Sequence, residues 1–82
     1  MIVNLYSLRD TVTNNFSDIK LFVNDEHAKR EYCAQLIKCA DSPIIKDLQI
    51  YKVGTYDLVN GDIVADKEFI CSAKEVMTYG EE

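Results

Sequence analysis

Tyrosines and nearby cations are the residues of this 82-residue sequence whose chemistry could serve a binding site. The chain has five tyrosines and no tryptophan. On a sheet, exposed aromatic rings stack on the bases of single-stranded nucleic acid, while cations beside them contact the phosphates. The candidate nucleic-acid-binding residues are Tyr6, Arg9, Lys20, Tyr51 and Lys52. Tyrosine also fills half-buried sheet positions with its hydroxyl group in water, so each ring has a second, purely structural interpretation.

The charge of the chain limits how it could contact DNA. The net charge is −5 and the pI is near 4.7, whereas neutralising many phosphates requires clustered Lys and Arg. We therefore expect any contact with DNA to be local. The alternative is a module that binds another protein, for which an acidic surface is an advantage.

No residue pattern in the sequence indicates catalysis or metal binding. The single histidine, His27, has no Ser/Asp or Cys partner in a recognisable arrangement, so we expect no enzymatic activity. Cys33, Cys39 and Cys71 form no CxxC pair and are too few for a structural zinc site. We expect them to be reduced thiols that pack as small hydrophobic side chains, and we expect neither a metal nor a cofactor.

Four segments have the composition and alternation of strands: residues 2–9, 18–23, 48–56 and 62–72, the last with an interruption at 65–67. Between the second and third, Asn24 can cap a helix from residue 25 to about 41. The helix has an apolar stripe that Ser42-Pro43 ends. The stripe consists of Ala28, Tyr32, Cys33, Leu36, Ile37 and Ala40. These elements predict an α+β fold of ββαββ order, with one amphipathic helix packed on an antiparallel sheet of about four strands.

The clearest turn signal is Asn60-Gly61, which supplies the positive φ angles of a hairpin between the last two strands. Gly54, inside the preceding strand, predicts a bulge or a close approach of another backbone.

We expect a single domain over residues 1–82, with about 74–82 forming a frayed acidic tail. Besides the helix stripe, six apolar residues should supply most of the core: Ile19, Leu21, Val23, Leu48, Ile50 and Phe69. Exposed sheet edges in so small a chain favour a homodimer. No apolar run approaches the length of a bilayer span and the first residues do not match a targeting peptide, so we expect a soluble protein.

Three segments resemble the small nonstructural protein of gokushovirus-type microviruses. They are Leu5-Tyr6-Ser7-Leu8-Arg9-Asp10, Ala28-Lys29-Arg30-Glu31-Tyr32, and Tyr51-Lys52-Val53-Gly54-Thr55-Tyr56-Asp57 followed by Asn60-Gly61-Asp62-Ile63. The resemblance covers roughly residues 2–70. The chain differs from many relatives in having Asn14-Asn15-Phe16-Ser17 where they have an aromatic and proline-rich segment, and in its acidic charge.

The resemblance implies a phage protein made in the cytoplasm of the infected bacterium and absent from the virion. It also implies a role in single-stranded DNA replication or packaging, with single-stranded DNA as the partner. The alternative partner, a viral or host protein, stays open.

Overall fold

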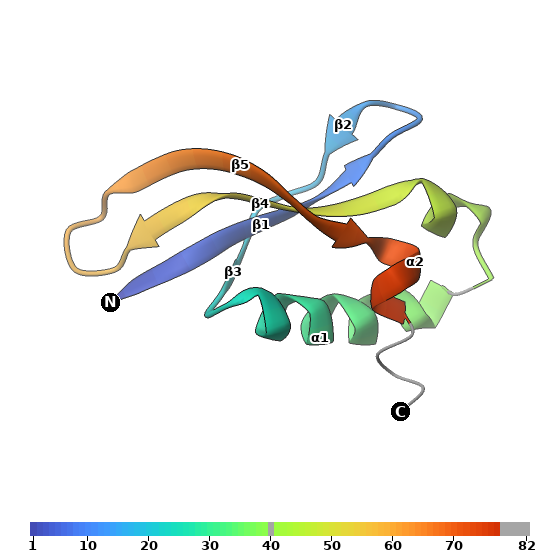
Figure 1. The fold of residues 1–82 in the computed structure, drawn as a ribbon, viewed down its shortest axis with the longest axis horizontal. Helices are drawn as coiled ribbons and strands as arrows, with labels where there is room; N and C mark the ends of the chain where they lie inside the picture. The colour runs from blue at the N-terminus through green and yellow to red at the C-terminus, as the bar shows by residue number, and fades with distance from the viewer. Residues whose placement is uncertain (40, 78–82) are drawn as a thin grey trace.

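The sheet is organised around β1 (Ile2–Asp10), the first strand of the chain. The computed structural model describes residues 1–39 and 41–77. On one side β1 pairs with β4 (Leu48–Asp57), which pairs with β5 (Ile63–Ser72). On the other side β1 pairs with two short strands, β2 (Asn15–Phe16) and β3 (Lys20–Phe22). All pairings are antiparallel (Figure 1), which confirms the α+β class.

The helix α1 (Asp25–Leu36) lies along one face of this sheet, as Figure 1 shows. It begins where the sequence predicts, because the Asn24 carboxamide oxygen accepts a hydrogen bond from the His27 amide at 2.8 Å. Its apolar stripe is buried at Ala28, Tyr32, Cys33 and Leu36. The helix is shorter than expected: it is followed by the 3-10 turns η1 (Ile37–Cys39) and η2 (Pro43–Asp47). Ile37 is exposed, and Ala40 lies outside the described residues.

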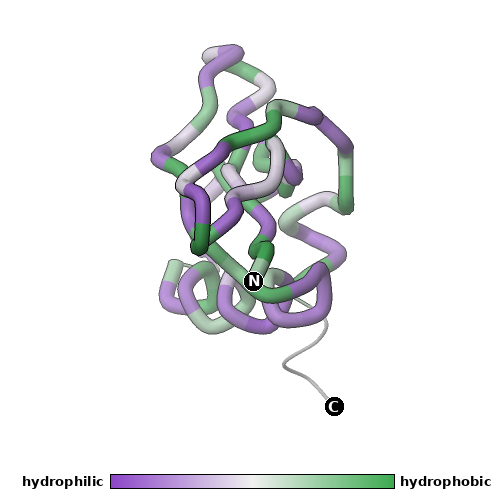
Figure 2. Tube along the Cα trace, turned by 90° about the vertical axis from the view of Figure 1, so that its left-hand side faces the viewer, coloured by the Kyte–Doolittle hydropathy of each residue, from purple (hydrophilic) through white to green (hydrophobic). Residues whose placement is uncertain are grey.

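The core lies between α1, the facing side of the sheet and the last helix, α2 (Ala73–Val76). Successive residues of a strand point to opposite faces of the sheet, so each strand presents alternate side chains to the helix. Figure 2 shows hydrophobic and hydrophilic residues mixed along the chain of the sheet. Nine residues form the buried cluster: Tyr6, Ala28, Tyr32, Leu36, Ile45, Ile50, Cys71, Ala73 and Val76. The expected fraying from residue 74 is wrong for residues 74–77, since α2 buries Val76 completely. Residues 78–82 of the expected tail lie outside the described part.

Four of the residues expected in the core are exposed instead. They are Ile19, Leu21, Val23 and Phe69, each more than half exposed. For Phe69 the physical reason is the register of β5, which shifts between Ile50 and Tyr51 and sets Phe69 opposite Tyr51. For the other three it is the register of β3: Leu21 opposes Leu5, whereas Phe22 opposes Asn4. Phe22 therefore faces the helix, where its ring lies 5.7 Å from that of Tyr6 and 5.5 Å from that of Tyr32. The alternation identified which residues share a face, but the wrong face was assigned to the core. Ile50 is buried and Leu48 packs against the core, as predicted.

The β4–β5 hairpin turns through residues 58–62, where Gly61 has a φ of 77°. Asn60 is not among the described residues with a positive φ, so that part of the expectation is wrong. The Asp57 carboxylate accepts hydrogen bonds from the amides of Val59 and Asn60, and these bonds lower its pKa. Gly54 is the site of a close approach, because a Cβ atom there would collide with the Val64 carbonyl oxygen. β5 is a continuous strand, without the interruption expected at 65–67. At this place the register between β4 and β5 shifts, between Lys52 and Gly54 of β4.

Cys33 and Cys71 are buried as expected, whereas Cys39 is exposed at the end of η1. Among residues 1–39 and 41–77, no three side chains of the kinds that ligate metals lie together. Within the same ranges, no helix has the length and apolar character needed to cross a membrane.

Candidate nucleic-acid interface

The strand register divides the sheet into a helix-covered face and a helix-free face. Residues opposite each other in antiparallel strands share a face, and successive residues of a strand alternate between faces. Ser7 opposes Tyr51, and Tyr51 opposes Phe69. These three residues therefore lie on the face opposite to Tyr6 and Ile50, which pack against α1. Arg9, two residues beyond Ser7, shares the helix-free face.

Three aromatic side chains form a row across the helix-free face. The Phe16 ring on β2 lies 5.5 Å from the Tyr51 ring on β4, which lies 5.7 Å from the Phe69 ring on β5, centroid to centroid. Both pairs are T-shaped. Phe16 is 41% exposed and Phe69 is 52% exposed. We call these three residues the aromatic row. Because neither helix covers it, the row offers apolar ring surface to a ligand.

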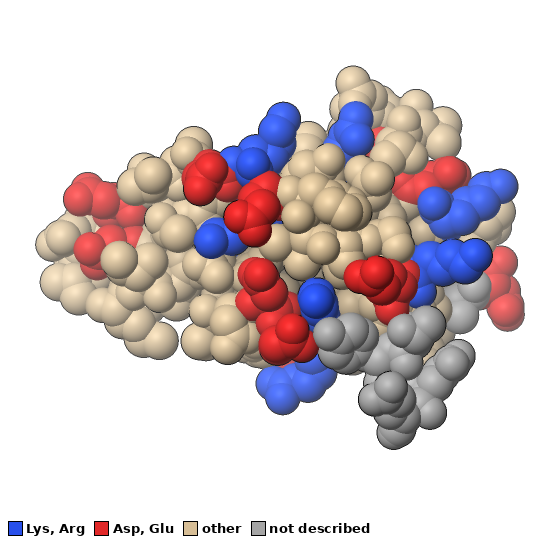
Figure 3. Space-filling view, viewed as in Figure 1, with Lys and Arg blue, Asp and Glu red and all other residues tan. Residues whose placement is uncertain are grey.

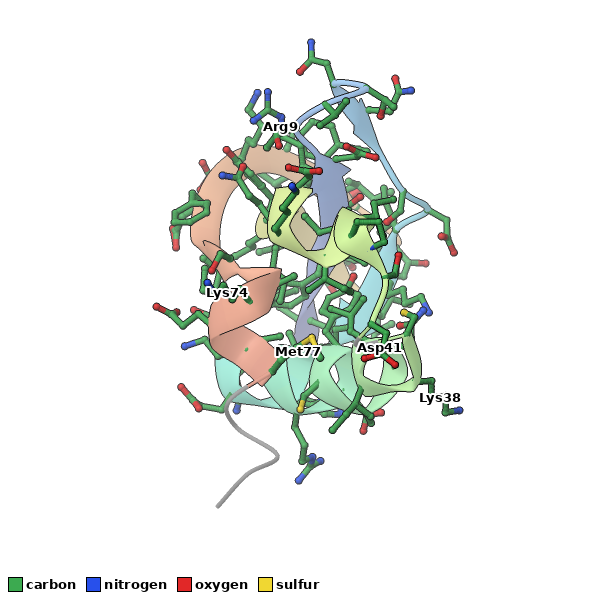
Figure 4. All side chains as sticks on the ribbon, turned by 90° about the vertical axis from the view of Figure 1, so that its right-hand side faces the viewer. Arg9, Lys38, Asp41, Lys74 and Met77 are labelled. Carbon is green, nitrogen blue, oxygen red and sulfur yellow. The ribbon has the colours of Figure 1, made fainter. Side chains whose placement is uncertain are left out.

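Two cations flank the aromatic row. The Lys67 Nζ atom lies 5.9 Å from the centre of the Phe16 ring, within the range of a cation–π contact. The Arg9 guanidinium donates to the Asn14 Oδ1 atom at 2.7 Å and to the Gln49 Oε1 atom at 3.4 Å. Figure 4 shows Arg9 at the side of the sheet remote from α1. Neither cation forms an ion pair with a described residue.

Positive charge does not form a broad patch on the side of the protein that Figure 3 shows. In the view of Figure 3, Lys and Arg groups are interspersed with Asp and Glu groups. With a net charge of −5, a contact with a polyanion would depend on a few positioned cations.

Of the five candidate residues, only Arg9 and Tyr51 lie together on the helix-free face. Tyr6 is fully buried, so the expectation that its ring is available to a base is wrong. Its hydroxyl donates to the Asp25 carboxylate at 2.5 Å and accepts from the Asn4 carboxamide at 3.0 Å. Burial, followed by the bond to Asp25, raises the pKa of Tyr6 well above its usual range.

Lys20 and Lys52 lie on the other side of the sheet from Arg9 and Tyr51. Both oppose Tyr6 in the register, Lys20 from β3 and Lys52 from β4, and therefore share the helix-covered face. Lys20 donates a hydrogen bond to the Gln35 side chain on α1 at 3.3 Å. The two lysines are therefore separated by the sheet from the aromatic row.

Sequence reasoning missed three residues of this site: Phe16, Lys67 and Phe69. Phe16 lies in a polar segment that gives no strand pattern, and Phe69 was assigned to the core. Their relation to Tyr51 depends on pairing between strands remote in the sequence. One consideration could have identified Phe69. A single helix covers only one face of a sheet, so an apolar ring on a strand can equally well lie on the uncovered face.

A comparison with models of known protein families gives a match over most of the chain. A family model described as "Phage ORF5 protein" matches residues 3–76, which include both faces of the sheet, α1 and α2. No curated protein and no solved structure gives a significant match. Because the matched segment spans most of the chain, the expectation of a phage protein is confirmed, and the chain belongs to the Phage ORF5 protein family.

Proposed function

We propose that this protein is a nonenzymatic accessory protein of a gokushovirus-type microvirus that binds single-stranded DNA during replication or packaging of the genome. It would act in the cytoplasm of the infected bacterium and be absent from the virion. The observation that supports this proposal best is the aromatic row, exposed on a sheet face that no described helix covers. Two cations that form no ion pair with a described residue flank this row.

The spacing of the rings favours an unpaired strand over a duplex. Their centroids are 5.5 and 5.7 Å apart, whereas successive bases of a duplex rise by about 3.4 Å. Bases that contact successive rings must therefore separate from one another. A single strand can do so, and each base–ring contact is worth roughly 1–3 kcal/mol.

The cations set the expected dependence on salt. Two phosphate contacts, one by Arg9 and one by Lys67, predict a slope of log K against log salt of about −1.4, because each contact with a single strand contributes about −0.7. This slope is shallow compared with that of a basic DNA-binding protein. The affinity would come mainly from the rings.

The test is a fluorescence-anisotropy titration of a labelled oligothymidylate with wild-type protein and two variants. Tyr51→Ala should weaken binding by about 5- to 150-fold, which corresponds to the loss of one base–ring contact. Lys52→Ala, the adjacent cation on the helix-covered face, is the matched control and should bind within about twofold of wild type. Absence of binding by wild-type protein at low salt, or equal loss in both variants, would contradict the proposal.

A second candidate function, protein binding, is favoured by the far end of the β4–β5 hairpin. Six large apolar side chains there are each at least half exposed: Met1, Ile2, Leu58, Val59, Ile63 and Val64. We call them the hairpin tip. The carboxylates of Asp57 and Asp62 accompany them, and in Figure 3 only acidic groups are coloured at this end. Such a surface suits a partner protein with an apolar site bordered by Lys or Arg.

The two candidates can be separated by one further variant. Leu58→Ser with Val59→Ser alters the hairpin tip and leaves the aromatic row intact. If the protein acts by binding DNA, this variant should bind oligothymidylate as wild type does. If it acts on a viral or host protein, the variant should lose the binding to that protein that the wild type shows in titrations with purified phage and host proteins.

Homodimerisation remains a prediction. The outer edge of β5 pairs with no other described strand and is available to a second copy. The central residues of β5, Asp66, Lys67 and Glu68, place charges of both signs at this edge, and such charges disfavour edge pairing. Light scattering over a range of protein concentrations measures the outcome directly.

A further inference from the structure

The Arg9 side chain is held in place without being neutralised. One guanidinium nitrogen donates to the Asn14 carboxamide oxygen at 2.7 Å and another donates to the Gln49 carboxamide oxygen at 3.4 Å. Both acceptors are uncharged. Of the five N–H donors of a guanidinium, two are used in this way and three remain for a ligand. Arg9 opposes Phe16 on one side and Gln49 on the other, so the charge lies at one end of the aromatic row.

The turn that presents Asn14 is itself well defined. The Asn14 amide donates to the Asp10 carbonyl oxygen at 2.8 Å, and the Asp10 carboxylate accepts from the amides of Val12 and Thr13 at 2.9 and 3.3 Å. Asn14 has a φ of 59°, a left-handed conformation that asparagine tolerates better than most residues. The backbone of this turn therefore fixes the place of the Asn14 side chain before any ligand arrives.

We infer that Asn14 and Gln49 are positioning residues, which orient the Arg9 guanidinium for one phosphate of the bound strand while leaving its positive charge available. This inference rests on the proposed function. A carboxylate in either place would hold the guanidinium at least as firmly, but it would cancel the charge that the phosphate needs. Orientation by neutral amides reduces the rotamer freedom that Arg9 would otherwise lose on binding.

The test uses Asn14→Asp, a substitution of nearly the same shape that converts the hydrogen bond to Arg9 into an ion pair. Aspartate also tolerates a positive φ, so the turn should be retained. In the oligothymidylate titration, Asn14→Asp should weaken binding as much as Arg9→Ala does, about five- to tenfold, and should make the salt slope shallower by about 0.7. Gln49→Glu should have the same two effects from the opposite side of the guanidinium.

Two further variants separate positioning from other causes. Thr13→Asp adds the same charge one residue earlier, at an exposed position, and should bind within about twofold of wild type. Asn14→Gly keeps the positive φ and removes the acceptor, so it should bind about two- to fivefold more weakly with an unchanged salt slope. Thermal melting of each variant confirms that it is folded.

The outcomes distinguish this inference from the proposed function. If wild-type protein binds the oligonucleotide but Asn14→Asp and Gln49→Glu bind equally well with the same slope, the positioning role is overturned and the proposed function stands. If Thr13→Asp weakens binding as much as Asn14→Asp, a general charge effect replaces positioning. If wild-type protein does not bind, both are overturned.

Discussion

The two faces of the sheet are made by alternate residues of the same strands, yet they have different compositions and surroundings. On β4, Ile50 is fully buried beneath α1, whereas the next residue, Tyr51, lies half-buried between two other rings on the helix-free face. The helix-covered face carries the core residues Tyr6 and Ile50 together with Lys20 and Lys52. The helix-free face presents the aromatic row beside two cations that form no ion pair with a described residue. The position of α1 therefore decides which alternate residues of each strand are buried in the core and which are left on the face that a partner could contact.

The largest effect should follow from a truncation on the covered face. Ile50→Ala should lower the free energy of unfolding by about 2–5 kcal/mol, because it removes buried methylene groups and leaves a cavity. Phe69→Ala, on the helix-free face, should lower it by only about 0.5–1.5 kcal/mol, since it loses little more than one ring contact. Urea denaturation followed by circular dichroism measures both. Equal losses would mean that the helix-free face contributes to the core, and the comparison between the faces would fail.

An intermediate effect should distinguish the two buried tyrosines of the core, Tyr6 on β1 and Tyr32 on α1. The Tyr6 hydroxyl bonds to both Asp25 and Asn4, so Tyr6→Phe should cost about 1–2 kcal/mol of unfolding free energy. The Tyr32 hydroxyl is buried and has no hydrogen-bond partner among the described residues. Tyr32→Phe should therefore raise the unfolding free energy by up to about 1 kcal/mol.

The same urea titrations at neutral pH give this pair of values. A loss of stability in Tyr32→Phe as large as that in Tyr6→Phe would show that the Tyr32 hydroxyl has a stabilising partner. In that case both buried tyrosine hydroxyl groups would have hydrogen-bond partners.

The smallest effect should be a loss of stability at alkaline pH. Burial raises the pKa of Tyr32 from 10.0 to about 12. The folded protein therefore keeps a proton that the unfolded chain releases above pH 10. The resulting stability is complete below pH 10 and is lost between pH 10 and 12, by about 1 kcal/mol at pH 11. The unfolding free energy at pH 8 minus that at pH 11 measures the sum of this loss and the loss from Tyr6, whose pKa is also raised. The Tyr32 contribution is the amount by which this difference becomes smaller in Tyr32→Phe. An unchanged difference would assign the alkaline loss to Tyr6, whose pKa burial also raises.

Local signals were sufficient to predict much of the fold. The cap at Asn24, the stripe at Ala28, Tyr32, Cys33 and Leu36, and the turn at Asn60-Gly61 depend on neighbours in the sequence, and all three are present. The close approach at Gly54 was also predicted, because glycine inside a strand indicates it directly.

The candidate site could be predicted only in part, because it depends on pairing between remote strands. Tyr51 and Arg9 were found by residue type, but no sequence feature shows that Phe16 and Phe69 flank Tyr51. Tyr6 was misassigned for the same reason. Its alternation within β1 is compatible with either face, and only the position of α1 places its ring in the core.

The most direct test of the account follows each residue of the protein while DNA binds. In a ¹H–¹⁵N NMR titration of wild-type protein with unlabelled oligothymidylate, we expect the largest shifts at Arg9, Phe16, Tyr51, Lys67 and Phe69. The amides of α1 should be nearly unaffected. Shifts concentrated along α1, or at Lys20 and Lys52, would place the binding surface on the helix-covered side and contradict the account.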